Sequence, residues 1–167
     1  MSFTQVSPHG VAALMSVLPG QPGVGDFEGG TVKAMLLGED SLLFSNFDDV
    51  VNLASASSSL DEYVTGGGTV YHRRELSTII IQVVAGVVQF RANDLVWNAM
   101  TSYDGGGDSG YVLFYVELSA ATGLDSNGAL DERIPLALMD LEFTPNGEDV
   151  TVKPSSSGYW AIDTNGC

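Results

Sequence analysis

The sequence is poor in basic residues. Its 167 residues include 6 Lys and Arg against 21 Asp and Glu, which gives a formal net charge of −15. Proteins bind nucleic acids and anionic membrane surfaces largely through Lys and Arg, so we expect neither a nucleic-acid partner nor a membrane partner. The ordinary consequence of such a charge is a soluble surface that repels other acidic molecules.

Cysteine and long hydrophobic runs are also scarce. The single cysteine, Cys167, excludes an internal disulfide and a thiolate metal site. The apolar run at 11–18 is too short to span a bilayer. No Lys or Arg precedes this run, which argues against a secretory signal peptide. We therefore expect a protein that begins at or near Met1 and is made in a cytoplasm.

What the sequence does contain is typical of a β protein. Apolar residues make up 44% of the chain, and its 20 glycines are suited to turns. A short helix is expected at 45–55 and a loop at 55–69. The predicted fold is mainly β, an antiparallel β-sandwich or barrel. Its strands are expected at 31–37, 76–84, 87–91, 111–118, 134–143, 149–154 and 158–162.

Two hairpin turns are predicted between these strands. Ala85-Gly86 permits a tight turn, and in 79–84 the odd-numbered residues share one face while the even-numbered residues share the other. Pro145-Asn146-Gly147 predicts a second hairpin, in which 149–154 returns alongside 134–143. In that outgoing strand Ala137, Met139, Leu141 and Phe143 are expected to face inward.

The strand at 111–118 is apolar on both faces. A strand of this kind is covered on both sides, either by its own domain or by another chain. Both alternatives are open at this stage, and the second favours assembly with a partner.

The first thirty residues differ in composition from the rest. They contain Pro8, Pro19 and Pro22 and no Lys or Arg, so we expect an extended N-terminal arm at 1–30 and a β-sandwich domain at 31–167. Candidate partner-binding residues are the apolar patch of this arm and two adjacent arginines, namely Val11, Leu14, Met15, Val17, Leu18, Arg73 and Arg74. The arginines are expected on opposite faces of a strand.

One short string suggests catalysis. Residues 107–110 match the letters around the nucleophile of chymotrypsin-like proteases, which would be Ser109. A serine nucleophile needs a histidine base, and the two histidines are His9, in the arm, and His72. Because Tyr111 and a β run follow the string, we interpret it as a loop entering a strand. No catalytic residue is predicted, and a hydrolase using Ser109 is the competing hypothesis.

Metal and ligand sites are weighed in the same way. The acidic loops at 104–108 and 125–132 offer oxygen ligands for calcium, but neither has the full EF-hand spacing. We predict no metal and no cofactor, and calcium binding by these loops stays open. Trp97 and Trp160 are interpreted as core or rim residues. The competing hypothesis makes them the sugar-binding platforms of a carbohydrate-binding module.

The middle of the chain resembles a family of small virion structural proteins of tailed bacteriophages. The resemblance covers roughly residues 31–160. The matching positions are Gly66 to Gly68, then Phe90, Ala92, Asp94 and Trp97 in an F-x-A-x-D-x-x-W pattern, then Tyr111 to Glu117.

This resemblance implies a capsid decoration (cement) protein without enzymatic activity. Such a protein binds the major capsid protein on the outer surface of the virion head as a homo-oligomer, here taken to be a trimer. The arm at 1–30 and an acidic insert at 121–132 are longer than the family pattern. A tail or head–tail connector protein of the same virion is therefore the alternative.

Overall fold

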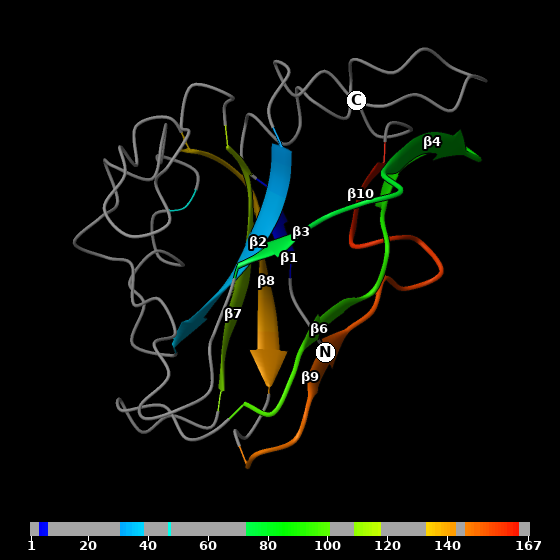
Figure 1. The fold of residues 1–167 in the computed structure, drawn as a ribbon. Helices are drawn as coiled ribbons and strands as arrows, with labels where there is room; N and C mark the ends of the chain where they lie inside the picture. Colours follow the sequence, from blue (N-terminus) through cyan, green and yellow to red (C-terminus); the bar gives the residue numbers. More distant parts are fainter. Residues whose placement is uncertain are drawn as a thin grey trace.

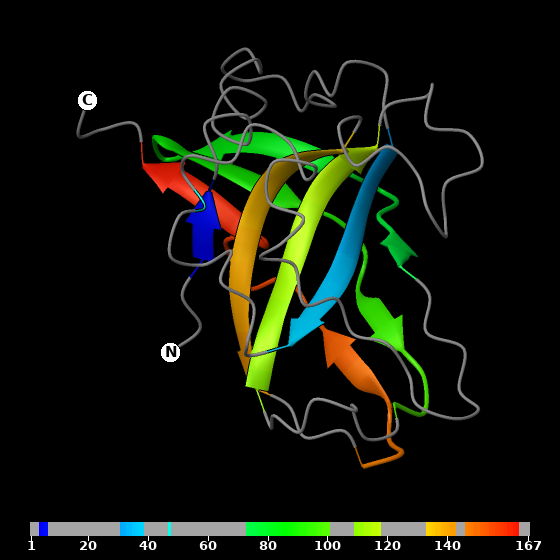
Figure 2. The same ribbon diagram turned by 90° about the vertical axis from the view of Figure 1, so that its left-hand side faces the viewer.

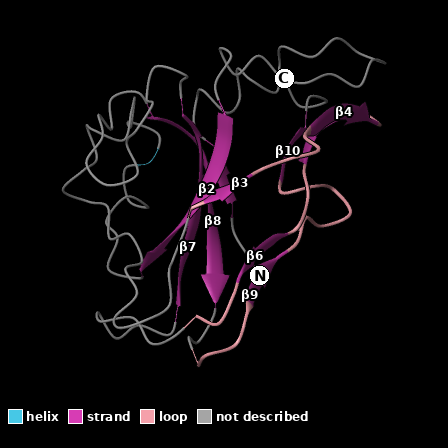
Figure 3. Ribbon diagram, viewed as in Figure 1, coloured by secondary structure: helices cyan, strands magenta, loops and turns pink. Residues whose placement is uncertain are grey.

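A computed structural model of the chain describes residues 4–6, 31–38, 47, 73–100, 109–117, 133–142 and 146–163. This part is almost entirely strand and loop (Figure 3). The strands are β1 (Thr4–Val6), β2 (Thr31–Gly38), β3 (Arg74–Glu75), β4 (Ile80–Val84), β5 (Val87–Arg91), β6 (Leu95–Trp97), β7 (Ser109–Glu117), β8 (Arg133–Glu142), β9 (Val150–Val152) and β10 (Trp160–Asp163).

The strands are arranged in two layers. One layer is a five-stranded sheet in the order β1-β8-β7-β2-β3. The other contains a three-stranded sheet, β10-β5-β4, and a two-stranded sheet, β6-β9. Figure 1 shows the larger sheet nearly edge-on with the two smaller sheets on one side of it, and Figure 2 shows it from its broad face. All strand pairs are antiparallel, so the predicted mainly β, sandwich-like architecture is confirmed.

The central strand of the large sheet is buried on both faces. Val112, Phe114 and Val116 of β7 belong to the cluster between the two layers. Leu113 and Tyr115 belong to a second cluster on the opposite face, and both are 0% exposed. The chain itself therefore covers both apolar faces, which decides between the two alternatives left open by the sequence.

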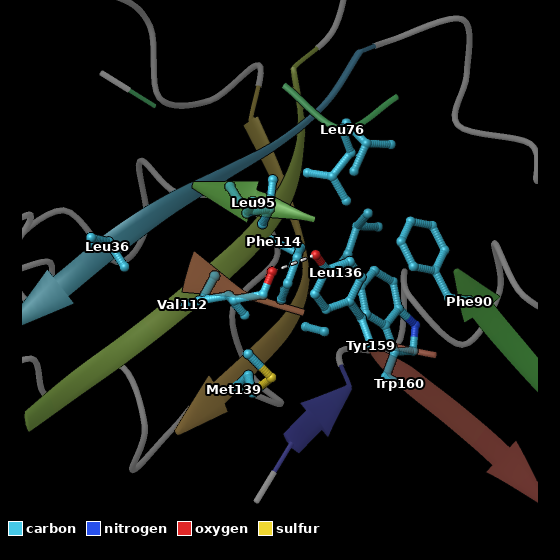
Figure 4. Close-up of a cluster of buried hydrophobic side chains, with 14 of the residues drawn as sticks. Leu36, Leu76, Phe90, Leu95, Val112, Phe114, Leu136, Met139, Tyr159 and Trp160 are labelled. Carbon is cyan, nitrogen blue, oxygen red and sulfur yellow. Dashed lines mark hydrogen bonds between the residues drawn. The ribbon is translucent and has the colours of Figure 1, made fainter. Parts of the chain in front are cut away.

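Aromatic rings from both layers meet in the core. Trp160 of β10 lies flat on Phe90 of β5, with ring centroids 3.8 Å apart and an interplanar angle of 9°. Phe114 of β7 contacts Trp160 from the other layer at 5.1 Å in a tilted arrangement, and it meets Tyr159 at 5.0 Å (Figure 4). Stacked and tilted contacts between aromatic rings stabilise a core beyond the area that they bury.

The Tyr159 hydroxyl links two backbone segments at one side of this core. Its oxygen lies 2.8 Å from the carbonyl oxygen of Asn93, between β5 and β6, and 3.0 Å from that of Val152 at the end of β9, so its single proton is shared between two backbone acceptors. Burial, followed by the nearby charge of Asp94, raises the pKa of the Tyr159 hydroxyl above its usual range. The neutral, hydrogen-bonding form is therefore the one that the fold requires.

The hairpin predicted at Ala85-Gly86 is confirmed. β4 and β5 pair from Ile80 opposite Arg91 to Val84 opposite Val87. The two turn residues have φ values of 51° and 80°, the left-handed pair that a two-residue turn needs to match the twist of the strands. The predicted alternation also holds, because Ile81 is 0% exposed and Ile80 is 39% exposed.

The second predicted hairpin is wrong. β9 pairs with β6 and not with β8, whose neighbours are β7 and β1. The turn at 146–148 is instead bonded to the segment that follows β6. The Gly147 amide donates to the Met100 carbonyl, and the Met100 amide donates to the Glu148 carbonyl. The expected inward residues of β8 are confirmed: Ala137 and Met139 lie in the cluster between the layers, and Leu141 packs against it. Phe143 lies outside the described residues.

The N-terminal segment also departs from expectation. Thr4–Val6 form a strand that pairs with Ala137–Met139, so the idea that 1–30 stays out of the sheet is wrong for these three residues. Val6 packs against the cluster between the layers. The rest of 1–30 lies outside the described residues, as does the helix expected at 45–55 apart from Phe47, which is buried.

Substituting Gly158 tests the closeness of β5 and the β9–β10 connection. A Cβ at Gly158 would overlap the backbone carbonyl of Phe90, and the φ of 94° adds strain. We expect Gly158→Ala to lower the free energy of unfolding by about 3 kcal/mol or more in chemical denaturation. Gly147→Ala is the control, since its φ is 90° with open space around it, and it should cost about 1 kcal/mol. Equal losses would contradict the close approach.

The Tyr159 hydroxyl gives the fold a pH dependence on the alkaline side. Because its pKa is higher in the folded than in the unfolded chain, its contribution to stability is complete below about pH 10 and falls as the pH rises further. Tyr159→Phe should lower the free energy of unfolding by about 1–2 kcal/mol at neutral pH. The difference between the two proteins should shrink above pH 10 in denaturation curves. A difference that grows there would refute the assignment.

Candidate interaction surface

The outward face of the three-stranded sheet is the candidate site. Its exposed apolar residues are Ile80 and Val84, which are 39% and 46% exposed. They are the large hydrophobic residues that stand exposed within the described part of the chain. Both come from β4, where alternation sends Ile81 into the core and its neighbours outward. An exposed apolar patch on an otherwise acidic protein is a candidate for contact with another protein.

The three strands around this patch carry no net formal charge. Gln82 lies between the two exposed residues, and its Nε2 donates to Oε1 of Gln89 at 3.2 Å across the β4–β5 pair. Ala161 of β10 stands opposite Gln89 and is exposed. β4 has no charged residue, and the +1 of Arg91 in β5 is balanced by the −1 of Asp163 in β10. In a chain of net charge −15 the three strands have a formal charge of zero.

Arg91, at the end of the patch, is held in place. Its Nη2 donates to the Ser156 carbonyl at 2.8 Å, so part of its hydrogen-bonding capacity is used within the chain. The turn that supplies this carbonyl is closed by two hydrogen bonds between the backbones of Ser155 and Gly158. The Arg91 side chain is thus fixed to the turn at 155–158.

The two arginines predicted to bind a partner lie elsewhere. Arg74 is in β3, an edge of the five-stranded sheet, and stands opposite Ala34 of β2. Arg73 comes directly before it, and both side chains are half-buried. A half-buried guanidinium presents less of its surface to another molecule than an exposed one does. Their role in binding remains a prediction.

The Lys33–Glu117 ion pair is not predicted from the sequence. Lys33 Nζ lies 3.0 Å from Glu117 Oε2, with the two side chains 23% and 10% exposed. These residues are on neighbouring strands, since β2 and β7 pair with Thr31 opposite Glu117. Lys33 stands opposite Tyr115, which belongs to the second buried cluster, so the pair lies beside that cluster. A charged residue in each of two apolar strands is the local sign of such a pair, but it does not show that the two strands are neighbours.

Ser109 is the first residue of β7 and pairs with Glu142 of β8. The predicted entry of this string into a strand is thus confirmed for Ser109. His9, His72 and the acidic stretches at 104–108 and 125–132 lie outside the described residues. Within the part that is described, no group of three or more His, Cys, Asp or Glu side chains is placed to hold a metal ion.

Both tryptophans are core residues. Trp97 is 1% exposed and Trp160 is 4% exposed. An aromatic platform for a sugar needs an open ring face, whereas one face of Trp160 is occupied by Phe90. The hypothesis of a carbohydrate-binding module built on these two residues is therefore wrong, and their interpretation as core residues is confirmed.

Comparisons with protein-family models, with curated proteins and with solved structures found no match to this chain. The described residues include no helix that is long and apolar enough to cross a membrane. Among the predicted contact residues, Val11, Leu14, Met15, Val17 and Leu18 fall outside the described ranges.

Neighbouring residues of β4 should differ sharply in their importance for folding. Ile81→Ala leaves a cavity in the core and should lower the free energy of unfolding by about 2–5 kcal/mol. Ile80→Ala, the matched control one residue away, should cost about 1 kcal/mol or less because the side chain remains partly in water. Urea denaturation of dilute protein measures both values. A loss at Ile80 as large as that at Ile81 would mean that this face is covered within the chain.

Proposed function

We propose that this chain is a structural virion protein of a tailed bacteriophage, a capsid decoration protein that binds the major capsid protein on the outer surface of the head. The observation that carries the proposal is the neutral, partly apolar face of β4, β5 and β10 on a protein of net charge −15. A molecule with one face of zero net charge and an acidic remainder docks in one orientation and keeps its other sides away from acidic neighbours.

The resemblance to phage virion proteins supports the proposal through the fold. Phe90 and Trp97 of the shared pattern are buried, and Asp94 forms an exposed ion pair with Lys153 at 3.6 Å. Tyr111–Glu117 is most of β7, the central strand of the large sheet. The matching positions thus specify the architecture of the domain, and the surface residues carry the argument for binding.

A decoration protein acts through buried area and shape, without a chemical step. The two-layered β domain suits this task, because its core is closed by the aromatic stack of Phe90, Trp160 and Phe114. We place the capsid contact on the outward face of β4 and on the apolar patch of the N-terminal segment around Leu14 and Met15. Burial of apolar surface contributes about 25 cal/mol per Å² to such a contact before the entropy of ordering is subtracted.

Immunogold labelling of phage particles that carry this chain tests the location. Decoration of the head predicts label distributed over the whole capsid. Label confined to the neck or tail would support the tail or connector alternative, and unlabelled particles would refute a virion role altogether.

The competing hypothesis is a hydrolase that acts through Ser109. It predicts that the protein reacts with a fluorophosphonate probe and that Ser109→Ala abolishes the reaction.

Co-sedimentation with stripped heads tests the contact residues. Leu14→Asp together with Met15→Asp should reduce binding to heads at least tenfold while the thermal unfolding midpoint is unchanged, since tenfold corresponds to about 1.4 kcal/mol. Substitution is preferable to truncation, because removing the first twenty residues would also delete β1 and unpair Ala137–Met139. Full binding by the double variant would remove the N-terminal patch from the interface.

A further inference from the structure

We propose that two copies of this chain associate through the free edges of their β4 strands. The strands would run antiparallel about a two-fold axis at Gln82, and the two three-stranded sheets would become one continuous six-stranded sheet. The proposal goes beyond the function proposed above: both use exposed residues of β4, but the dimer requires no capsid partner.

The first observation is the open hydrogen-bonding edge of β4. In the order β10-β5-β4, the described strands leave β4 with a partner on one side only. In a hairpin closed by a two-residue turn, the residues that flank the turn form a hydrogen-bonded pair. Val84, Gln82 and Ile80 therefore direct their amides and carbonyls toward β5, while those of Ile81 and Val83 point to the free edge.

The second observation is the symmetry of the strand itself. Pairing about Gln82 sets Ile81 opposite Val83 of the other copy, and each such pair can exchange two backbone hydrogen bonds. On the outward face it sets Ile80 opposite the exposed Val84, and Gln82 opposite its own copy. A slip of two residues in either direction would place the Gln82 amide against an apolar side chain. The self-complementary register is thus the favoured one.

The third observation is charge. Two copies of a chain with net charge −15 repel each other, and repulsion is smallest where the contact carries no charge of its own. β4 has no charged residue, whereas β10, the other edge of the same sheet, ends in Asp163. Edge strands of monomeric proteins are usually protected by charged side chains or proline, and β4 has neither.

The geometry fixes the number of copies and the sense of the salt dependence. An antiparallel edge pair is closed after two copies, so this contact builds a dimer and differs from the trimer that the resemblance implies. The strand has 5 residues, so the interface is small and the dimer should be in exchange with the monomer at micromolar concentrations. Salt screens the repulsion between the acidic copies, and association should become stronger as ionic strength rises.

Amide hydrogen exchange of the full chain, followed residue by residue by NMR, tests the edge directly. At low concentration the amides of Ile81 and Val83 should exchange fast, while those of Gln82 and Val84 are protected by β5. Raising the concentration about a hundredfold, into the range where the dimer forms, should slow exchange at Ile81 and Val83 at least tenfold. Unchanged exchange at these two amides would overturn the proposal.

Sedimentation equilibrium of two matched variants tests the axis. Gln82→Lys would bring two like charges face to face and should weaken the dimer at least tenfold. Ala161→Lys is the control: it adds the same charge to the same face, on the strand that is separated from β4 by β5, and should leave association within about threefold of the wild type.

Three results would refute the edge-paired dimer. These are a wild-type chain that stays monomeric at high salt and high concentration, a dimer that Gln82→Lys does not weaken, and equal weakening by the two lysine variants. If Gln82→Lys fails to fold, the wild-type exchange pattern still decides, because it requires no substitution.

Discussion

Closure of both faces of the large sheet is the constraint on which the rest of this structure depends. β2, β7 and β8 are apolar on both sides, so a single layer packed against them would leave half of their surface in water. One face is closed by the two smaller sheets, with Phe90 and Trp160 stacked at 3.8 Å. The other is closed around Phe47, Leu113 and Tyr115. The outer surface of the domain is what remains once both faces of the large sheet are covered.

That closure changes the basis for a binding function. From the sequence, two apolar faces on one strand suggest more hydrophobic surface than the chain can cover, and hence a partner. The structure covers both faces within one chain, and the large hydrophobic residues that stand exposed in its described part are Ile80 and Val84 on β4. Assembly is therefore expected at the edge of the β4–β5 hairpin and not at the centre of the large sheet. At that edge, β4 presents a small uncharged surface on a strongly acidic molecule.

The parts of the fold that could be predicted are those encoded locally. Ala85-Gly86 can adopt two left-handed conformations in succession, so the β4–β5 hairpin is determined by adjacent residues. Pro145-Asn146-Gly147 is an equally local turn signal, but the partner of the following strand is decided by which edge is free. β9 joins β6 because β7 and β1 flank β8. The Lys33–Glu117 pair likewise depends on the pairing of β2 with β7, between residues more than eighty positions apart. A local sequence pattern does not reveal such a pairing.

The most direct test of this account is the solvent exposure of individual methyl groups in dilute monomer, measured by NMR with a soluble paramagnetic agent. Complete closure predicts that the methyl groups of Leu113 and Leu138 are as protected as those of Val112, whereas the methyl groups of Ile80 and Val84 are strongly broadened. Strong broadening of Leu113 and Leu138 would contradict the account, because the second face of the large sheet would then be open and the chain would need a partner to cover it.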